Sequence, residues 1–331
     1  MPYAQAGEIR LYYESFGRGV PFLFVSGTGW PGEPWKLKQV PAFIDRYQVI
    51  VYDHRGAGKS DAPAGYYSTR EFAQEAANLL DALGINEPAH IIGHSMGGRV
   101  CQWLAIDYPR KVRSMIQAAS GSGSMGNPDY PRWLTVDSLK SMIEKGYKEH
   151  MLSHFKSRFF FPPEFVKAHP EVLEILFKSF WETGPSSIPI YAMSSPATSM
   201  RPVSYSTRLM RPTLVLVDGE DKADADTGNH VITSKHLRDN IYNAEFAVVE
   251  GCGHGFSGTS RSRLTRSSGI GSTGTNLLAP PCDSVVRNER MRVSDQEEAL
   301  LALLQQDTGT GEIIFIFSVA PIPLRTRTML D

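Results

Sequence analysis

The residues of first chemical interest are 93–98, with the sequence GHSMGG. The apolar run 89–92 before them is typical of a short buried strand, and residues 99–105 after them are typical of a helix. A serine between two glycines at such a junction is the G-x-S-x-G nucleophile elbow. The sharp turn holds the serine hydroxyl clear of the sheet, at the positive end of the helix. The pattern predicts that Ser95 is a nucleophile, followed along the chain by an acid and then a histidine.

A serine hydroxyl becomes a good nucleophile only when a neighbouring base takes its proton. His254 is the best candidate, because it lies in the glycine-rich loop 251–255 directly after the strand-like run 244–249. His94 is a weaker candidate because it is adjacent to Ser95, and neighbouring side chains at such a turn diverge. The remaining candidates lack the strand-then-glycine context or lie in an expected helical insertion: His54, His90, His230, His150, His154 and His169.

The acid that orients the histidine is expected after the preceding strand, residues 213–217. The chain there reads DGEDKAD over residues 218–224, which offers four carboxylates. Asp221 has the best position, several residues beyond the strand and after a glycine turn. Asp224 is the second choice, and Asp218 and Glu220 stay open as alternatives.

A tetrahedral intermediate needs two preorganised N–H donors directed at its oxyanion. The backbone N–H of Met96 is the first, since this residue follows the nucleophile and begins a helix. The second is expected from the loop after the apolar strand 22–25, which reads SGTGW over residues 26–30. Thr28 is the first choice there and Gly29 the near alternative, because glycines allow the backbone to approach a substrate closely.

Strand-like and helix-like segments alternate up to about residue 251, which indicates a mostly parallel sheet with helices on both faces. Residues 68–83 have helical spacing and begin with a capping-box pattern. The region from about 121 to 205 differs, because its helix-like stretches, 138–155 and 163–181, have no strand between them. We therefore expect a helical cap inserted between two core strands, above the strand ends. Its many aromatic side chains predict a cap core, with a minority lining a substrate pocket.

The composition is that of an ordinary soluble globular protein, with 41% hydrophobic and 21% charged residues among 331. The net charge of −1 gives no reason to expect nucleic acid or an anionic membrane as a partner. Three scattered cysteines are too few for a disulfide framework or a zinc site, and we expect no metal and no cofactor. The N-terminus lacks a signal-peptide pattern and no run approaches the ~20 apolar residues of a membrane span, which predicts a cytoplasmic protein. The sequence does not indicate an oligomeric state.

The chain changes character after Phe256. Residues 257–276 are dominated by Ser, Thr, Gly and Arg, a composition that buries too little apolar surface to become ordered. A capping box predicts a short helix at 294–304, and 313–317 is an uncharged, β-prone run. We expect four segments: 1–120, the first part of the core; 121–205, the cap; 206–256, the second part of the core; and 257–331, an atypical and partly disordered tail without chemistry.

With these motifs in this order, the chain resembles the α/β-hydrolase fold superfamily, of the serine-nucleophile type with a helical lid. The segments that carry the resemblance are 26–29, 53–61, 93–98, 212–221 and 251–254. The resemblance covers residues 1 to about 256. Within the superfamily, the chain is most similar to the 3-oxoadipate enol-lactonase-like hydrolases and carboxylesterases. For the turn at 53–60 it implies a structural role near the site. The tail departs from the family, which usually closes with one helix soon after the histidine.

The resemblance and the order Ser…Asp…His imply a serine hydrolase that cleaves carboxylic esters or lactones through an acyl-enzyme. Ser95 attacks the carbonyl, His254 moves the proton and Asp221 holds the imidazole, while the amides of Met96 and Thr28 stabilise the oxyanion. A serine nucleophile argues against haloalkane dehalogenases and epoxide hydrolases, which have an aspartate there. C–C bond hydrolysis or cofactor-free perhydrolysis on the same triad stays open. So does a different class, a small-molecule receptor or an inactive homologue. The expected partner is a small-molecule ester or lactone.

Overall fold

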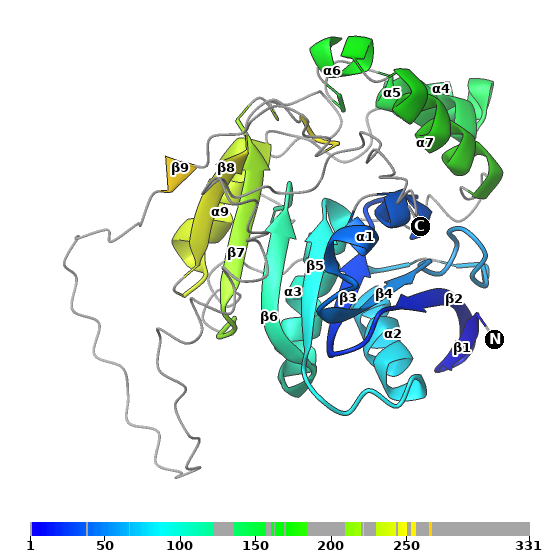
Figure 1. Cartoon of the computed structure of the whole chain (residues 1–331). Coiled ribbons are helices and arrows are strands. Elements are labelled where there is room, and N and C mark those ends of the chain that lie inside the picture. Colours follow the sequence, from blue (N-terminus) through cyan, green and yellow to red (C-terminus); the bar gives the residue numbers. More distant parts are fainter. Residues whose placement is uncertain are drawn as a thin grey trace, which may run out of the picture.

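A nine-stranded sheet forms the centre of the computed structural model, with the strand order β1-β2-β4-β3-β5-β6-β7-β8-β9 (Figure 1). The strands are β1 (Tyr3–Ala6), β2 (Ile9–Phe16), β3 (Val20–Val25), β4 (Tyr47–Tyr52), β5 (Ala89–His94), β6 (Val112–Ala118), β7 (Thr213–Asp218), β8 (Glu245–Val249) and β9 (Thr265–Arg266). The structure describes residues 2–37, 39–65, 67–121, 136–156, 160–161, 163–168, 170–183, 209–219, 221, 230–242, 244–249, 253–255 and 265–266.

In the described part of the chain, β4, β3, β5, β6, β7 and β8 run parallel, and antiparallel pairing is confined to β1 with β2, β2 with β4, and β8 with β9. The predicted mostly parallel sheet is therefore confirmed. Alternate residues of β3 pack into two separate clusters, Leu23 and Val25 in one and Phe22 and Phe24 in the other. Both faces are thus covered, which explains why β3 and β7 are almost continuously apolar. The carboxyl ends of β3, β5, β6, β7 and β8 meet at one edge of the sheet.

Helices cover the sheet on both sides and beyond its carboxyl edge. They are α1 (Gln39–Phe43), α2 (Thr69–Ala82), α3 (Met96–Asp107), α4 (Val136–Lys145), α5 (Tyr147–Phe155), α6 (Pro163–Ala168), α7 (Pro170–Thr183) and α9 (His230–Asn240), with short 3-10 turns η1 (Glu33–Leu37) and η2 (Pro109–Lys111). The predicted capping box of α2 is present, because the Ser68 side chain accepts from the Glu71 N–H and the Glu71 carboxylate accepts from the Ser68 N–H.

Helices α4 to α7 lie between β6 and β7 in the chain, and Figure 1 shows them grouped beyond the carboxyl ends of the strands. The single helix expected over 138–155 is wrong in one respect: Gly146, with φ of +81°, separates α4 from α5. Phe160, Phe161 and Phe180 are buried as a cap core requires, whereas Trp181 is 49% exposed. Phe177 is half-buried, and Phe155 is the last residue of α5. Three further aromatic residues expected there lie outside the described residues: Trp133, Phe159 and Tyr191.

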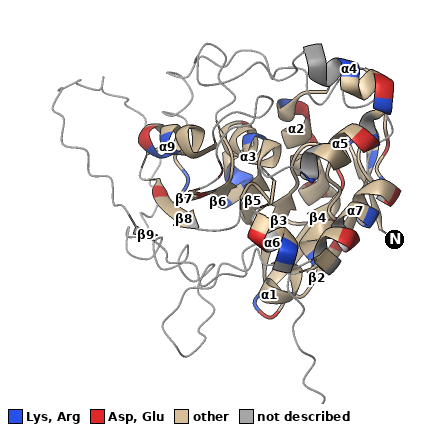
Figure 2. Ribbon diagram, turned by 90° about the horizontal axis from the view of Figure 1, so that it is seen from above, with Lys and Arg blue, Asp and Glu red and all other residues tan. Residues whose placement is uncertain are grey.

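Two residues of the expected tail are described. Thr265 and Arg266 form β9, which pairs with β8 and differs from the disorder expected for that stretch. The predicted helix at 294–304 and the apolar run 313–317 lie outside the described residues. In the described part of the chain, no helix is long and apolar enough to cross a membrane. Figure 2 shows both signs of charge interspersed on the outer helices, including α7 and α9.

Two core histidines are held neutral by burial. The His90 ring packs 6.0 Å from the Phe22 ring, and its Nδ1 lies 2.6 Å from the Ser114 hydroxyl. The His54 ring stacks on Phe72 with 4.8 Å between centroids. Desolvation lowers the pKa of each histidine to about 4, from an ordinary value of 6.5. Both side chains therefore take up a proton on unfolding when the pH lies between these values.

Stability is accordingly expected to fall as the pH drops from 6.5 towards 4. The unfolded state binds more protons in that window, so each histidine lowers the free energy of unfolding by about 1.4 kcal/mol per pH unit. His90→Gln should remove the contribution of one histidine, about 1.4 kcal/mol per pH unit, from this dependence of the free energy of unfolding on pH. Urea unfolding at pH 7.5, 6 and 5 measures it. His236→Gln, on the surface side of α9, is the matched control. An unchanged slope in His90→Gln would contradict the prediction.

Candidate active site

The elbow places Ser95 between β5 and α3 in a strained backbone conformation. Its φ of 52° and ψ of −119° are rare for a residue with a side chain. A Cβ at Gly93 would collide with the Gly97 carbonyl, and a Cβ at Gly97 would collide with the Val25 carbonyl at the end of β3. The glycines on either side of the serine are therefore required by close backbone packing, as the motif predicts.

Three hydrogen bonds hold the Ser95 backbone in this conformation. The Ser95 N–H donates to the Ala118 carbonyl at 2.9 Å. The Ser95 carbonyl accepts from the Ser120 hydroxyl at 2.8 Å and from the Gly98 N–H at 3.0 Å. Both backbone groups of the serine are satisfied by the end of β6, the residues after it and the start of α3. The strained turn is therefore held rigidly at the carboxyl edge of the sheet.

The loop after β3 lies directly against the elbow. An added Cβ at Gly27 would stand 3.3 Å from the Ser95 Cβ and 3.2 Å from the His94 Nδ1. Thr28 is the next residue of this loop and is half-buried. Met96 begins α3, so its N–H is among those that have no acceptor within the helix. The role of both residues as oxyanion donors stays a prediction.

The loops after β7 and β8 bring Asp221 and His254 together. Asp221 is fully buried, and its Oδ2 accepts a hydrogen bond from the His254 Nδ1 at 3.1 Å. A turn in which the Asp221 N–H donates to the Asp218 carbonyl places the carboxylate beyond the strand end. Asp218 itself stays in β7, and the other two candidates, Glu220 and Asp224, lie outside the described residues. Asp221 is therefore the carboxylate that contacts His254.

His94 has a structural contact that sequence reasoning missed. Its Nε2 lies 2.8 Å from the His254 carbonyl. Burial, with a contribution from the nearby His254 ring, lowers the pKa of His94 to about 3. The ring is therefore neutral, and its Nε2 must carry a proton to donate to that carbonyl. His94 thus tethers the histidine loop to the elbow and is not available as the base.

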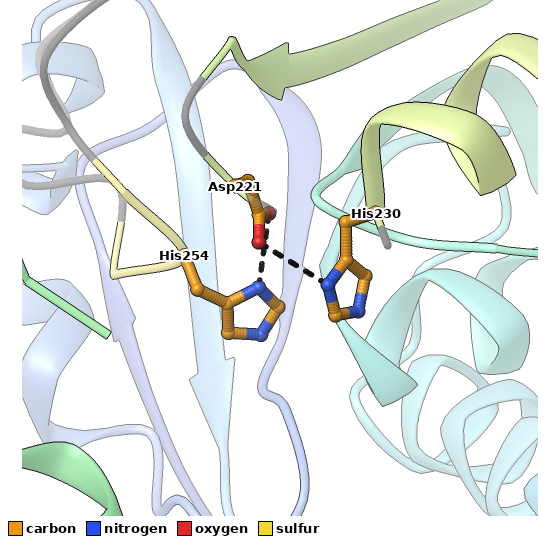
Figure 3. Close-up of side chains that lie close together, drawn as sticks. All are labelled: Asp221, His230 and His254. Carbon is orange, nitrogen blue, oxygen red and sulfur yellow. Dashed lines mark hydrogen bonds and ion pairs between the residues drawn. The ribbon is translucent and has the colours of Figure 1, made fainter. Parts of the chain in front are cut away.

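His230 is the second residue that sequence reasoning missed. It is the first residue of α9, and its Nδ1 lies 3.2 Å from the Asp221 Oδ1 (Figure 3). Its ring also packs against the His254 ring, with 4.2 Å between centroids. Burial by itself would raise the pKa of Asp221, but the two histidines outweigh it and hold that pKa well below the usual range. Nothing in the sequence around His230 indicates this contact.

The turn at 53–60 supports the loop that follows β3, consistent with the structural role that the resemblance implies. The Asp53 carboxylate accepts from the Gly32 N–H at 2.7 Å and from the Lys59 N–H at 2.8 Å. The buried His54 places its Nε2 3.2 Å from the Ser26 carbonyl. These contacts fix the residues on both sides of Thr28 to the core.

Aromatic residues from the helical insertion contact the histidine loop. The Phe160 carbonyl accepts from the Gly255 N–H at 2.7 Å, and the Phe160 ring lies 5.3 Å from the His254 ring. Trp30, in the loop after β3, stacks on Phe160 with 6.1 Å between centroids. The candidate site is therefore bordered by aromatic side chains next to His254.

Comparison with known proteins agrees with this architecture. The sequence model of the alpha/beta hydrolase fold matches residues 20–259, more than two thirds of the chain. The chain belongs to the alpha/beta hydrolase fold family. The match ends just beyond the His254 loop, so the family's pattern covers the elbow, the acid loop and the histidine loop.

Relatives of this hydrolase include proteins named carbamate hydrolase RutD. That of Stutzerimonas stutzeri is 30% identical over 250 residues, 74% of this chain and 89% of the relative. That of Azorhizobium caulinodans is 44% identical over 115 residues, 35% of this chain and only 43% of the relative. The 3-oxoadipate enol-lactonase 2 of Acinetobacter baylyi is 27% identical and covers 74% of this chain and 86% of its own.

Among solved structures, Est816, described as an N-acyl homoserine lactone degrading enzyme, is 28% identical with a TM-score of 0.63. The alignment covers 76% of this chain and 93% of Est816. The predicted resemblance to enol-lactonase-like hydrolases is thus confirmed. These relatives support a hydrolase that acts on a small-molecule substrate.

Proposed function

We propose that this protein is a serine hydrolase that cleaves a carboxylic ester or lactone through an acyl-enzyme. The observation that carries the proposal is the buried Asp221–His254 hydrogen bond of 3.1 Å, made at the sheet edge where the strained Ser95 stands. An acid, an imidazole and a serine on three separate loops have the roles and chain order of a hydrolase triad.

In the first step Ser95 Oγ attacks the carbonyl carbon and His254 Nε2 takes the hydroxyl proton. The Asp221 carboxylate keeps the other imidazole proton on Nδ1, so Nε2 presents a lone pair. Because the pKa of Asp221 is held so low, the carboxylate stays charged and stabilises the imidazolium that forms. The tether from His94 to the His254 carbonyl limits the movement of that loop during proton transfer.

The negative charge that develops on the carbonyl oxygen needs donors already in place. The N–H groups of Met96 and Thr28 serve as the two donors in this proposal. The rigid packing of Gly27 against the elbow supports this, since it fixes the loop relative to Ser95. His254 then protonates the leaving alcohol, and a water activated by the same imidazole hydrolyses the acyl-enzyme.

The apolar border of the site favours a substrate with an apolar group next to the reacting carbonyl. Trp30 and Phe160 stack on each other, and Phe160 contacts the His254 ring. The names of the relatives suggest lactones and carbamates as substrate classes to test. An ester and a lactone share the carbonyl electrophile and differ only in whether the leaving alcohol stays attached.

A fluorophosphonate probe and a substrate panel test the proposal. We expect stoichiometric covalent labelling at Ser95, located by peptide mass spectrometry, and turnover of p-nitrophenyl esters or acyl lactones. Exclusive cleavage of a vinylogous diketone would indicate C–C bond hydrolysis on the same triad. Ligand binding with a single slow turnover would indicate a receptor. Absence of labelling in folded protein would contradict the proposal, because phosphonylation requires an assembled serine and base.

A further inference from the structure

We propose that Asp221, His230 and His254 form a binding site for one divalent transition-metal ion of the Zn²⁺ class, and that its occupation switches the hydrolase off. The switching part rests on the proposed function, whereas the binding part does not. A hydrolase triad uses one histidine on its acid. Here two imidazoles approach opposite oxygens of the same carboxylate (Figure 3).

The donor set and its spacing suit such an ion. Two imidazole nitrogens and a carboxylate are the ligands of many three-residue zinc sites, which keep a fourth position for water. The nitrogen-to-oxygen distances are 3.2 Å for His230 and 3.1 Å for His254, and the three ligand atoms lie within 4.8 Å of one another. Ligands held tetrahedrally at about 2.0–2.1 Å from zinc stand roughly 3.3 Å apart, so small side-chain adjustments complete the site.

The surroundings also favour a cation over an empty cluster. All three side chains are buried, with exposed fractions of 0% for Asp221, 5% for His230 and 3% for His254. A carboxylate that binds a divalent ion in this poorly solvated place would attract it strongly, because electrostatic attraction is strongest where water is excluded.

Metal binding would disable the base by reversing its tautomer. In the proposed catalytic form the Nδ1 of His254 carries the proton and its Nε2 accepts the Ser95 proton. A metal ion needs the Nδ1 lone pair, so the proton moves from Nδ1 to Nε2 and the imidazole stays neutral. Nε2 then has no lone pair for the serine hydroxyl. The ion also takes over the carboxylate that stabilises the imidazolium, so two parts of the triad are lost together.

Isothermal titration calorimetry of the metal-free full chain with ZnCl₂ tests the binding. We expect one ion per chain, and a cobalt-substituted sample with the visible absorption of a four-coordinate nitrogen and oxygen site. His230→Gln should weaken zinc binding by at least about 100-fold, since even an outer-shell partner of a ligand costs roughly 10- to 100-fold. His236→Gln makes the same chemical change on the same helix, away from the cluster, and should bind like the unmodified chain.

Inhibition is read from p-nitrophenyl ester hydrolysis, with each variant compared to its own zinc-free rate. Zinc should inhibit the unmodified chain and His236→Gln, EDTA should restore the rate, and His230→Gln should resist inhibition. Ser95→Ala should still bind one zinc ion. Zinc binding by an unmodified chain that has no esterase activity would contradict the proposed function and leave the metal site standing. Absence of zinc binding by the unmodified chain, or equal loss in both histidine variants, would overturn the metal site.

Discussion

Ser95→Ala is expected to lower kcat for ester hydrolysis by about 10⁴-fold or more, with little change in fold. The substitution removes the attacking oxygen, and neither His254 nor the oxyanion donors can replace it. Fluorophosphonate labelling should disappear in the same variant. Initial rates with a p-nitrophenyl ester, together with circular dichroism to confirm folding, provide the measurement. A variant that keeps more than a tenth of the original rate would show that another group is the nucleophile.

Ser95→Gly is the matched control for strain at this position. Both variants lack the hydroxyl and should be equally inactive. Alanine keeps the Cβ in the φ 52° conformation, whereas glycine adopts it freely. The glycine variant should therefore be more stable by about 1–3 kcal/mol in urea unfolding, the usual cost of such a backbone conformation. Equal stabilities would mean that the elbow is not strained in solution.

Asp221→Asn is expected to lower kcat by about 10⁴-fold, as replacement of a triad aspartate by asparagine does elsewhere. The two carboxylate oxygens contact His254 and His230 separately. An amide has one acceptor oxygen and one donor group, so at least one imidazole must change its tautomer. If the amide nitrogen faces His254, its Nε2 becomes protonated and cannot act as a base. The uncharged amide also no longer stabilises the imidazolium.

The control for this prediction is Asp224→Asn, which alters the second candidate from sequence reasoning by the same chemical change. Its kcat should stay within about twofold of the unmodified chain, because the Asp221 carboxylate is the one that contacts the His254 Nδ1. Both kcat and KM are measured for each variant at pH 8. A large loss in Asp224→Asn with normal activity in Asp221→Asn would assign the acid to the other residue.

Much of the fold follows from local patterns that a single sequence carries. The capping box of α2 needs only Ser68 and Glu71 three residues apart, and it forms as expected. The division of the predicted helix 138–155 into α4 and α5 was harder to predict, because a single glycine within a helical pattern is often tolerated. At Gly146 the chain enters the left-handed region instead and ends α4. The spacing of apolar residues therefore predicted that the insertion is helical, but it did not predict the boundary between α4 and α5.

The nucleophile elbow is what the sequence by itself determined most completely. Its glycines are needed because backbone atoms within and next to the motif approach too closely for a Cβ. The glycines can be recognised in the sequence directly. The chain order of serine, acid and histidine was likewise readable, since parallel strands bring their carboxyl ends to one edge. The identity of the acid was preferred but not fixed by that reasoning, because a loop of four carboxylates allows several geometries.

The tertiary structure decided which side chains meet across that edge. It placed Asp221 against His254 and His94 against the His254 carbonyl, 160 residues away in the chain. It also placed His230 against the second carboxylate oxygen of Asp221. These contacts join separate loops, so no local spacing encodes them. They depend on the paths of the loops and on how the side chains are buried, which only the folded chain defines. The second histidine on the acid, and the metal site proposed from it, arise from that arrangement alone.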